Sequence, residues 1–220
     1  MKKIYELENN YISVQEQSYG GSQTYFRGVK GAFNKGRNLG GCGIVAIGDT
    51  ISYLKNDTEF SSIDEYRSYF KSISKNALWI PTRLGLNFIH ITLAAKSIFR
   101  KNKLSYKIKW CFSRKKLYTR IKGMLINNIP VILCIPKILK PSKNKEELSF
   151  YDCSVNKVSK THGHFVTVTG IYEDNNKLYL QISSWGKKFY ISFEEYVQFS
   201  KHHIFGLLGN ILYIEPSSTR

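Results

Sequence analysis

The clearest strand pattern in the chain is HFVTVTGIYEDNNKLYLQISSWGKKFYISF, residues 164–193. It contains three runs rich in β-branched and aromatic residues, at 164–171, 177–183 and 187–193. The turn-forming residues EDNN join the first two runs, and SSWG leads into the third. Runs of this length with short turn-rich connections predict neighbouring antiparallel strands. The C-terminal half of the chain is therefore expected to build an antiparallel sheet.

The residues before 164 show mostly helical periodicity. Apolar residues recur at helical spacing after Cys42, and Ser62 with Glu65 has the spacing of a capping box. Further helices are expected after Pro81 and at 117–125, and a short one after the Ser192 and Glu195 capping box. Strands are expected at 106–112, 131–135 and 206–215, and a long loop at 136–160.

Helices first and an antiparallel sheet afterwards is an α+β pattern. A chain of 220 residues with 42% hydrophobic residues is long enough for one well-packed domain. We expect a helical subdomain at about 42–130 and a sheet subdomain at about 131–220.

The charge of the chain is strongly positive, with 33 Lys and Arg against 16 Asp and Glu and a formal net charge of +17. Residues 96–122 alone hold eleven basic residues and no acidic one. Such a run is compatible with nucleic-acid binding. The excess is mainly lysine, however, in a chain also rich in Asn and Ile, as an AT-rich genome would encode. A solvated basic surface is the favoured interpretation, and a nucleic-acid partner is not expected.

No apolar run is long enough for a transmembrane helix, and the N-terminus lacks the apolar core of a signal peptide. A cytoplasmic protein is expected. The four cysteines lie far apart, and in that compartment they are expected to be free thiols. Cys111 and Cys134 lie in apolar runs and are expected to be buried hydrophobic residues.

Cys42 lies in a different setting, GGCGIVAIGDTISYL at residues 40–54. It stands between Gly41 and Gly43 at the expected start of a helix. The positive end of a helix lowers a thiol pKa, and small neighbours leave room for a substrate carbonyl and an oxyanion. A helix start packed under glycines, with the cysteine as a small filler, is the alternative interpretation.

His164 begins the first strand of residues 164–193, and Ser183 stands at the end of the second. Antiparallel neighbours can bring the start of one strand beside the end of the next. A histidine base needs a partner for its second ring nitrogen, and a serine hydroxyl can accept that hydrogen bond. We therefore expect His164 and Ser183 to be in contact.

The combination of GCG at a helix start, HFVTVTG on a strand and SSWG after the next strand resembles the papain-like cysteine peptidases. The C39-like peptidases are the most similar branch. Ser184, Trp185 and Gly186 match the last three residues of the family's Asn-Ser-Trp-Gly, and Gly170 matches the glycine after the histidine strand. The segment IKGMLINNIPVILCIP also resembles the helix and strand that lie between cysteine and histidine. The resemblance covers residues 38–200.

The resemblance implies a role for each matching residue. Cys42 would be the nucleophile, His164 the general base and acid, and Ser183 the residue at the family's Asn or Asp position. Trp185 would shield the histidine's hydrogen bond from water, with Gly41 and Gly43 supporting the site. The family's oxyanion glutamine stands several residues before the cysteine. No glutamine is found there and Gln23 is too distant to align, so Asn38 is the expected substitute.

These residues predict a cysteine hydrolase, most simply a peptidase, that needs no cofactor and no metal. Its partner would be a peptide or protein, or a small amide or acyl substrate. Acyl transfer or amide hydrolysis at the same site is one alternative. A weakly catalytic or non-catalytic scaffold that binds partners through its basic surface is another, because Ser183 and the missing glutamine depart from the family pattern.

Overall fold

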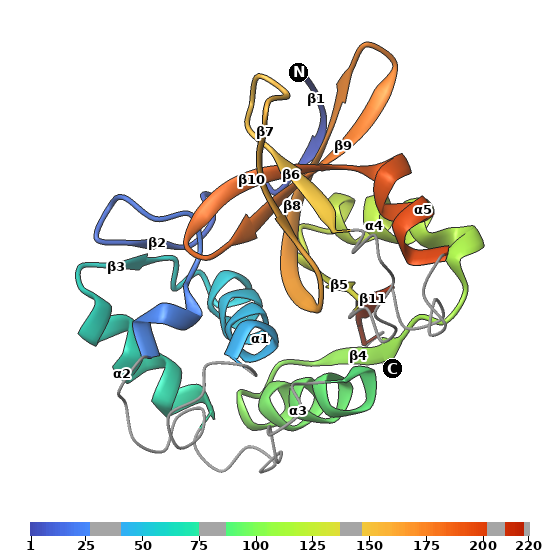
Figure 1. Cartoon of the computed structure of the whole chain (residues 1–220). Helices are drawn as coiled ribbons and strands as arrows, with labels where there is room; N and C mark the ends of the chain where they lie inside the picture. The colour runs from blue at the N-terminus through green and yellow to red at the C-terminus, as the bar shows by residue number, and fades with distance from the viewer. Residues whose placement is uncertain (27–40, 75–86, 137–146, 202–209, 218–220) are drawn as a thin grey trace.

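The computed structural model describes residues 1–26, 41–74, 87–136, 147–201 and 210–217 (Figure 1). The helices are α1 (Gly41–Leu54), α2 (Ile63–Ser74), α3 (Phe88–Lys101), α4 (Leu117–Ile126) and α5 (Phe193–Lys201), with 3₁₀ turns η1 (Gln23–Phe26) and η3 (Arg114–Lys116). The strands are β1 (Lys2–Glu6), β2 (Ser13–Val14), β3 (Glu59–Phe60), β4 (Tyr106–Trp110), β5 (Val131–Ile135), β6 (Leu148–Tyr151), β7 (Lys157–Thr161), β8 (His164–Asp174), β9 (Lys177–Ser184), β10 (Lys187–Ser192) and β11 (Ile211–Pro216). The chain is thus α+β, as the sequence predicts.

The large sheet has the strand order β4-β11-β5-β8-β9-β10-β6-β7, and every pairing in it is antiparallel. The three strands expected in residues 164–193 are β8, β9 and β10, which confirms that prediction. Strand β8 is long enough to pair with two strands along one edge. Its first half pairs with β5, where His164 lies opposite Ile135, and its second half pairs with β1, where Gly170 lies opposite Glu6. The sheet also takes β1 and β4 from residues before 131.

The long loop expected at 136–160 is wrong in part, because β6 and β7 form a hairpin within it. The strand pattern is weak there: β6 is only four residues long, and β7 (KVSKT) is polar and largely exposed. Such an edge strand lacks the apolar alternation that marks a half-buried strand. The remainder of that stretch lies outside the described residues.

The predicted starts of α2 and α5 are confirmed, whereas the start predicted for α3 cannot be compared at Pro81. The Ser62 hydroxyl accepts from the Glu65 N–H at 3.1 Å, and the Ser192 hydroxyl accepts from the Glu195 N–H at 3.3 Å, so α2 and α5 are capped as predicted. Helix α3 begins after Asn87, whose side chain caps it. Pro81, the expected first-turn residue of that helix, lies outside the described residues.

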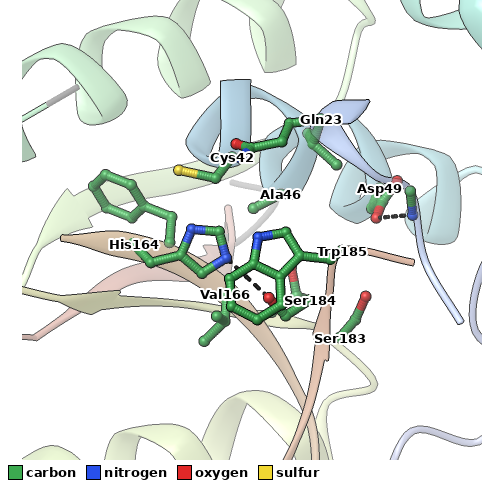
Figure 2. Close-up of a pocket in the computed structure, with 13 residues that line it drawn as sticks. Gln23, Cys42, Ala46, Asp49, His164, Val166, Ser183, Ser184 and Trp185 are labelled. Carbon is green, nitrogen blue, oxygen red and sulfur yellow. Dashed lines mark hydrogen bonds between the residues drawn. The ribbon is translucent and has the colours of Figure 1, made fainter. Parts of the chain in front are cut away.

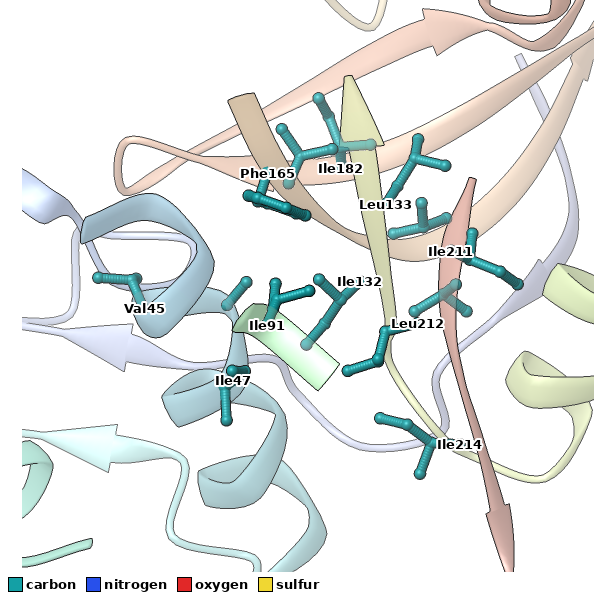
Figure 3. Close-up of a cluster of buried hydrophobic side chains, with 14 of the residues drawn as sticks. Val45, Ile47, Ile91, Ile132, Leu133, Phe165, Ile182, Ile211, Leu212 and Ile214 are labelled. Carbon is teal, nitrogen blue, oxygen red and sulfur yellow. The ribbon is translucent and has the colours of Figure 1, made fainter. Parts of the chain in front are cut away.

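The core fills the space between the sheet and helices α1 and α3 (Figure 3). Ile47 from α1 and Ile91 from α3 are fully buried, as are Ile132 from β5 and Ile182 from β9. Because α1 packs against both β8 and β5, its first turn is held close to the start of β8. No helix among the described ranges has the length and apolar content needed to cross a lipid bilayer.

Candidate active site

Cys42 is the second residue of α1, so the predicted helix start is confirmed. The first backbone N–H groups of a helix have no partner within the helix and can face a ligand. The residue keeps partial exposure, and the backbone N–H groups of Phe165, Gly43 and Cys42 act to lower the pKa of its thiol. A cysteine on α1 and the first residues of β8 therefore meet, although they are more than 120 residues apart in sequence.

The pKa of the Cys42 thiol differs from the sequence-based expectation. Burial raises it above its ordinary value, and the backbone N–H groups around the sulfur lower it by less. The N–H groups at the helix start lower this pKa, as expected, but desolvation of a thiolate outweighs them, so the net shift is upward. The resting thiol is protonated at neutral pH.

His164 is the first residue of β8 and only 7% exposed. Its Nε2 lies 2.9 Å from the Ser184 hydroxyl oxygen, which is a normal hydrogen-bond distance. Figure 2 shows the imidazole between the sulfur of Cys42 and the hydroxyl of Ser184. Burial lowers the pKa of His164 to about 4, so the ring is neutral at pH 7. Cys42 and His164 are thus a neutral thiol and a neutral imidazole that line the same pocket.

The expected contact between His164 and Ser183 is not made, and Ser184 takes that position. Ser183 lies opposite Thr167 in the β8–β9 pairing. Successive side chains of a strand point to opposite faces, and His164 is an odd number of residues from Thr167. The hydroxyl of Ser183 donates instead to the carbonyl of Tyr19 at 2.7 Å. The sequence correctly predicts that the end of β9 lies beside His164. The residue in contact is Ser184 and not its neighbour Ser183.

Trp185 stacks on His164, with ring centroids 4.8 Å apart and planes 20° from parallel. It occupies a two-residue turn between β9 and β10, where Lys187 pairs with Ser184. Both turn residues have positive φ, 52° at Trp185 and 74° at Gly186. A bulky residue in this backbone region is strained. The strained turn places a wide apolar ring over the imidazole and its hydrogen bond, the position predicted for Trp185.

Gln23 is the site residue that sequence reasoning set aside. It lines the same pocket as Cys42, and Figure 2 shows its side chain beside the cysteine. It packs over Gly41, where a Cβ on the glycine would stand 3.1 Å from the Cβ of Gln23. Asn38, the residue expected in this position, lies outside the described residues. Gln23 was not predicted because it stands 19 residues before Cys42, too far to align with the family's glutamine. The local sequence feature that marks it is the pair Gly20 and Gly21 just before it.

The pocket around these side chains is narrow, with a volume of about 20 Å³. Its lining comprises Gly21, Gln23, Cys42, Val45, Ala46, Asp49, His164, Phe165, Val166, Thr167, Ser183, Ser184 and Trp185. The side chains of Gln23, Cys42 and His164, an amide, a thiol and an imidazole, meet in this pocket at the first turn of α1. Within the part of the chain that the structure describes, no group of His, Cys, Asp and Glu is arranged to hold a metal ion.

Comparison with known proteins gives no match to a protein-family model, to a curated protein or to a solved structure. The resemblance to papain-like peptidases therefore rests on the motifs of the sequence alone.

Proposed function

We propose that the chain is a cysteine hydrolase of papain-like fold that cleaves peptide or amide bonds through an acyl-enzyme. The observation that carries the proposal is the placement of His164. One ring nitrogen is held by Ser184, the ring is covered by Trp185, and the imidazole faces Cys42. A nucleophile, a base and an orienting group in this order form the arrangement that nucleophilic catalysis requires.

The first chemical step follows from the neutral pair. As the sulfur of Cys42 attacks the substrate carbonyl carbon, His164 accepts the thiol proton, and the carbonyl oxygen becomes an oxyanion. The backbone N–H of Cys42 and the side-chain amide of Gln23 are the donors for that oxyanion. His164 then gives its proton to the leaving amine as the carbon–nitrogen bond breaks, leaving a thioester on Cys42.

Water completes the cycle. His164 takes a proton from the water as its oxygen attacks the thioester carbonyl, and returns it to the leaving sulfur. An amine in place of water would give acyl transfer with the same residues. A peptide or protein, or a small amide, is thus the proposed substrate. All four cysteines are free thiols, which suits the cytoplasm as the proposed location.

Acylation by p-nitrophenyl acetate tests this function without a known substrate. The exposed thiol of Cys153 serves as an internal reference. We expect peptide mapping to show Cys42 acylated at least about tenfold faster than Cys153 at pH 7.5, although Cys42 is less exposed. His164→Ala should remove this advantage, because the thiol then has no base.

The control is Cys153→Ser, which should leave the Cys42 rate unchanged. Equal acylation of Cys42 and Cys153 in the natural chain, or a Cys42 rate that survives His164→Ala, would show that no poised nucleophile exists.

A further inference from the structure

Asp49 is a buried carboxylate that the proposed reaction does not use. It lies on α1, seven residues after Cys42, and is 1% exposed. Among the described residues no lysine, arginine or histidine forms an ion pair with it. A buried charge without a cation is costly, so its retention calls for a reason.

Both oxygens of Asp49 accept hydrogen bonds from other parts of the fold. Oδ2 accepts from the backbone N–H of Gly21 at 2.8 Å, and Oδ1 accepts from the hydroxyl of Tyr66 on α2 at 2.7 Å. Figure 2 shows Asp49, with one hydrogen bond dashed, on the other side of the pocket from Cys42. A Cβ at Gly21 would collide with the Tyr66 hydroxyl. The backbone of residue 21 thus approaches both side chains directly.

Residues 19–23, which we term the 19–23 segment, are also held from the sheet side. Tyr19 N–H donates to the Gly186 carbonyl at 2.9 Å, and Gly186 N–H donates to the Gly21 carbonyl at 3.1 Å. The Ser183 hydroxyl donates to the Tyr19 carbonyl at 2.7 Å. Asp49 holds the opposite side of the segment. Gln23 follows two residues later and packs over Gly41, beside Cys42.

We propose that Asp49 is a positioning residue that, through Gly21, fixes the 19–23 segment so that the amide of Gln23 faces the sulfur of Cys42. Asp49 and Cys42 share one helix, in which seven residues span about 10 Å along the axis. The carboxylate therefore fixes the distance between the nucleophile and the oxyanion donor. The inference rests on the proposed function, because Gln23 matters only if an oxyanion forms.

The surroundings of Asp49 make it the group that can respond to pH. Four tyrosines interact electrostatically with it, and the pKa of each is raised, so they stay protonated: Tyr11, Tyr25, Tyr66 and Tyr69. Burial raises the pKa of Asp49 itself to about 6, while that of His164, which lines the same pocket, is about 4. A proton on Asp49 weakens the acceptor for Gly21 N–H, and the 19–23 segment then loosens.

The test compares two reactions of Cys42. Acylation by p-nitrophenyl acetate develops an oxyanion, whereas alkylation by iodoacetamide does not. We expect Asp49→Ala to slow acylation about tenfold or more while alkylation changes less than about twofold, since one oxyanion donor is worth about a hundredfold. Asp49→Asn keeps an oxygen for Gly21 N–H and should recover most of the rate. In the natural chain the ratio of acylation to alkylation should fall below pH 6, and in Asp49→Asn it should not.

A double-mutant cycle with Gln23→Ala decides whether Asp49 acts through Gln23. The double variant Gln23→Ala with Asp49→Ala should acylate no more slowly than Gln23→Ala alone. Additive losses, or equal losses of acylation and alkylation, would overturn the proposal. If Asp49→Ala does not fold, Tyr66→Phe replaces it in the same cycle, with a smaller loss of about threefold.

Hydrogen exchange separates this proposal from the proposed function. Loss of the Asp49 acceptor should speed exchange of the Gly21 amide at least about tenfold, whether or not Cys42 is acylated. Unchanged exchange in Asp49→Ala overturns the positioning role. Fast exchange without any preferential acylation of Cys42 in the natural chain overturns the proposed function, and with it the catalytic purpose of the contact.

Discussion

Ser183 and Ser184 are adjacent in β9 but bond to different partners, and only Ser184 contacts the histidine of the candidate site. Ser184 bonds to His164, while Ser183 faces the other way and bonds to Tyr19. The difference comes from the two-residue repeat of a β-strand. Both serines are almost fully buried, so water cannot readily replace the hydrogen-bond partner of either hydroxyl.

This arrangement predicts different effects for two alanine variants. Ser184→Ala should change the tautomer of His164 and slow Cys42 acylation by about tenfold or less, since a hydrogen bond contributes about 1 kcal/mol. Ser183→Ala should leave the tautomer unchanged. Long-range proton–nitrogen NMR of the imidazole measures the tautomer directly. A tautomer change in Ser183→Ala alone would contradict the assignment of Ser184.

At the scale of elements, the turn between β9 and β10 has a strained backbone and places the Trp185 ring over His164. Trp185 and Gly186 both have positive φ, as in the two-residue turns that favour Asn-Gly. The tryptophan is therefore a poor choice for the turn itself. Its ring packs between His164 and Phe150, at centroid distances of 4.8 and 5.5 Å.

Trp185→Asn should keep the hairpin, because asparagine suits the backbone, and should expose the imidazole. We expect the pKa of His164 to rise from about 4 toward 6.5, since burial is what lowers it. An NMR titration of the ring measures this. Trp185→Phe is the matched control and should keep the pKa low. An unchanged pKa in the asparagine variant would mean that other residues bury the ring.

At the scale of the whole molecule, Asp49 and His164 give opposite dependences of stability on pH. The folded-state pKa of Asp49 is about 6 against an ordinary 3.8, so between these values the folded state binds more protons and stability falls as pH rises. The folded-state pKa of His164 is about 4 against 6.5, so stability rises with pH over nearly the same range. Each difference amounts to about 3 kcal/mol at most. The two effects largely cancel in the natural chain.

Asp49→Asn removes the contribution of Asp49 to the pH dependence of stability and leaves that of His164. Its free energy of unfolding should exceed that of the natural chain by about 2 kcal/mol at pH 7 and by much less at pH 4. Between pH 4 and 6.5 the stability of the variant should rise, whereas that of the natural chain stays nearly level. Urea unfolding at several pH values measures both curves. A less stable variant at pH 7 would mean that the carboxylate stabilises the fold.

Much of the fold follows from local patterns that can be read in the amino-acid sequence. The β-branched and aromatic runs in residues 164–193 specify three strands, and serine caps specify the starts of α2 and α5. The sequence also determined that Cys42 begins a helix and that His164 begins a strand. It missed β6 and β7 because a polar edge strand carries little apolar pattern.

Which side chains are in contact depends on how the folded chain packs. Strand register selects Ser184 over Ser183, and the packing of the 19–23 segment on α1 brings Gln23 beside Cys42 across 19 residues of sequence. Burial, which depends on every neighbour, raises the pKa of Cys42 although a helix start favours the thiolate. Contacts and desolvation are properties of the packed chain. Local sequence spacing therefore indicates candidate reacting groups, whereas the fold determines their geometry and charge.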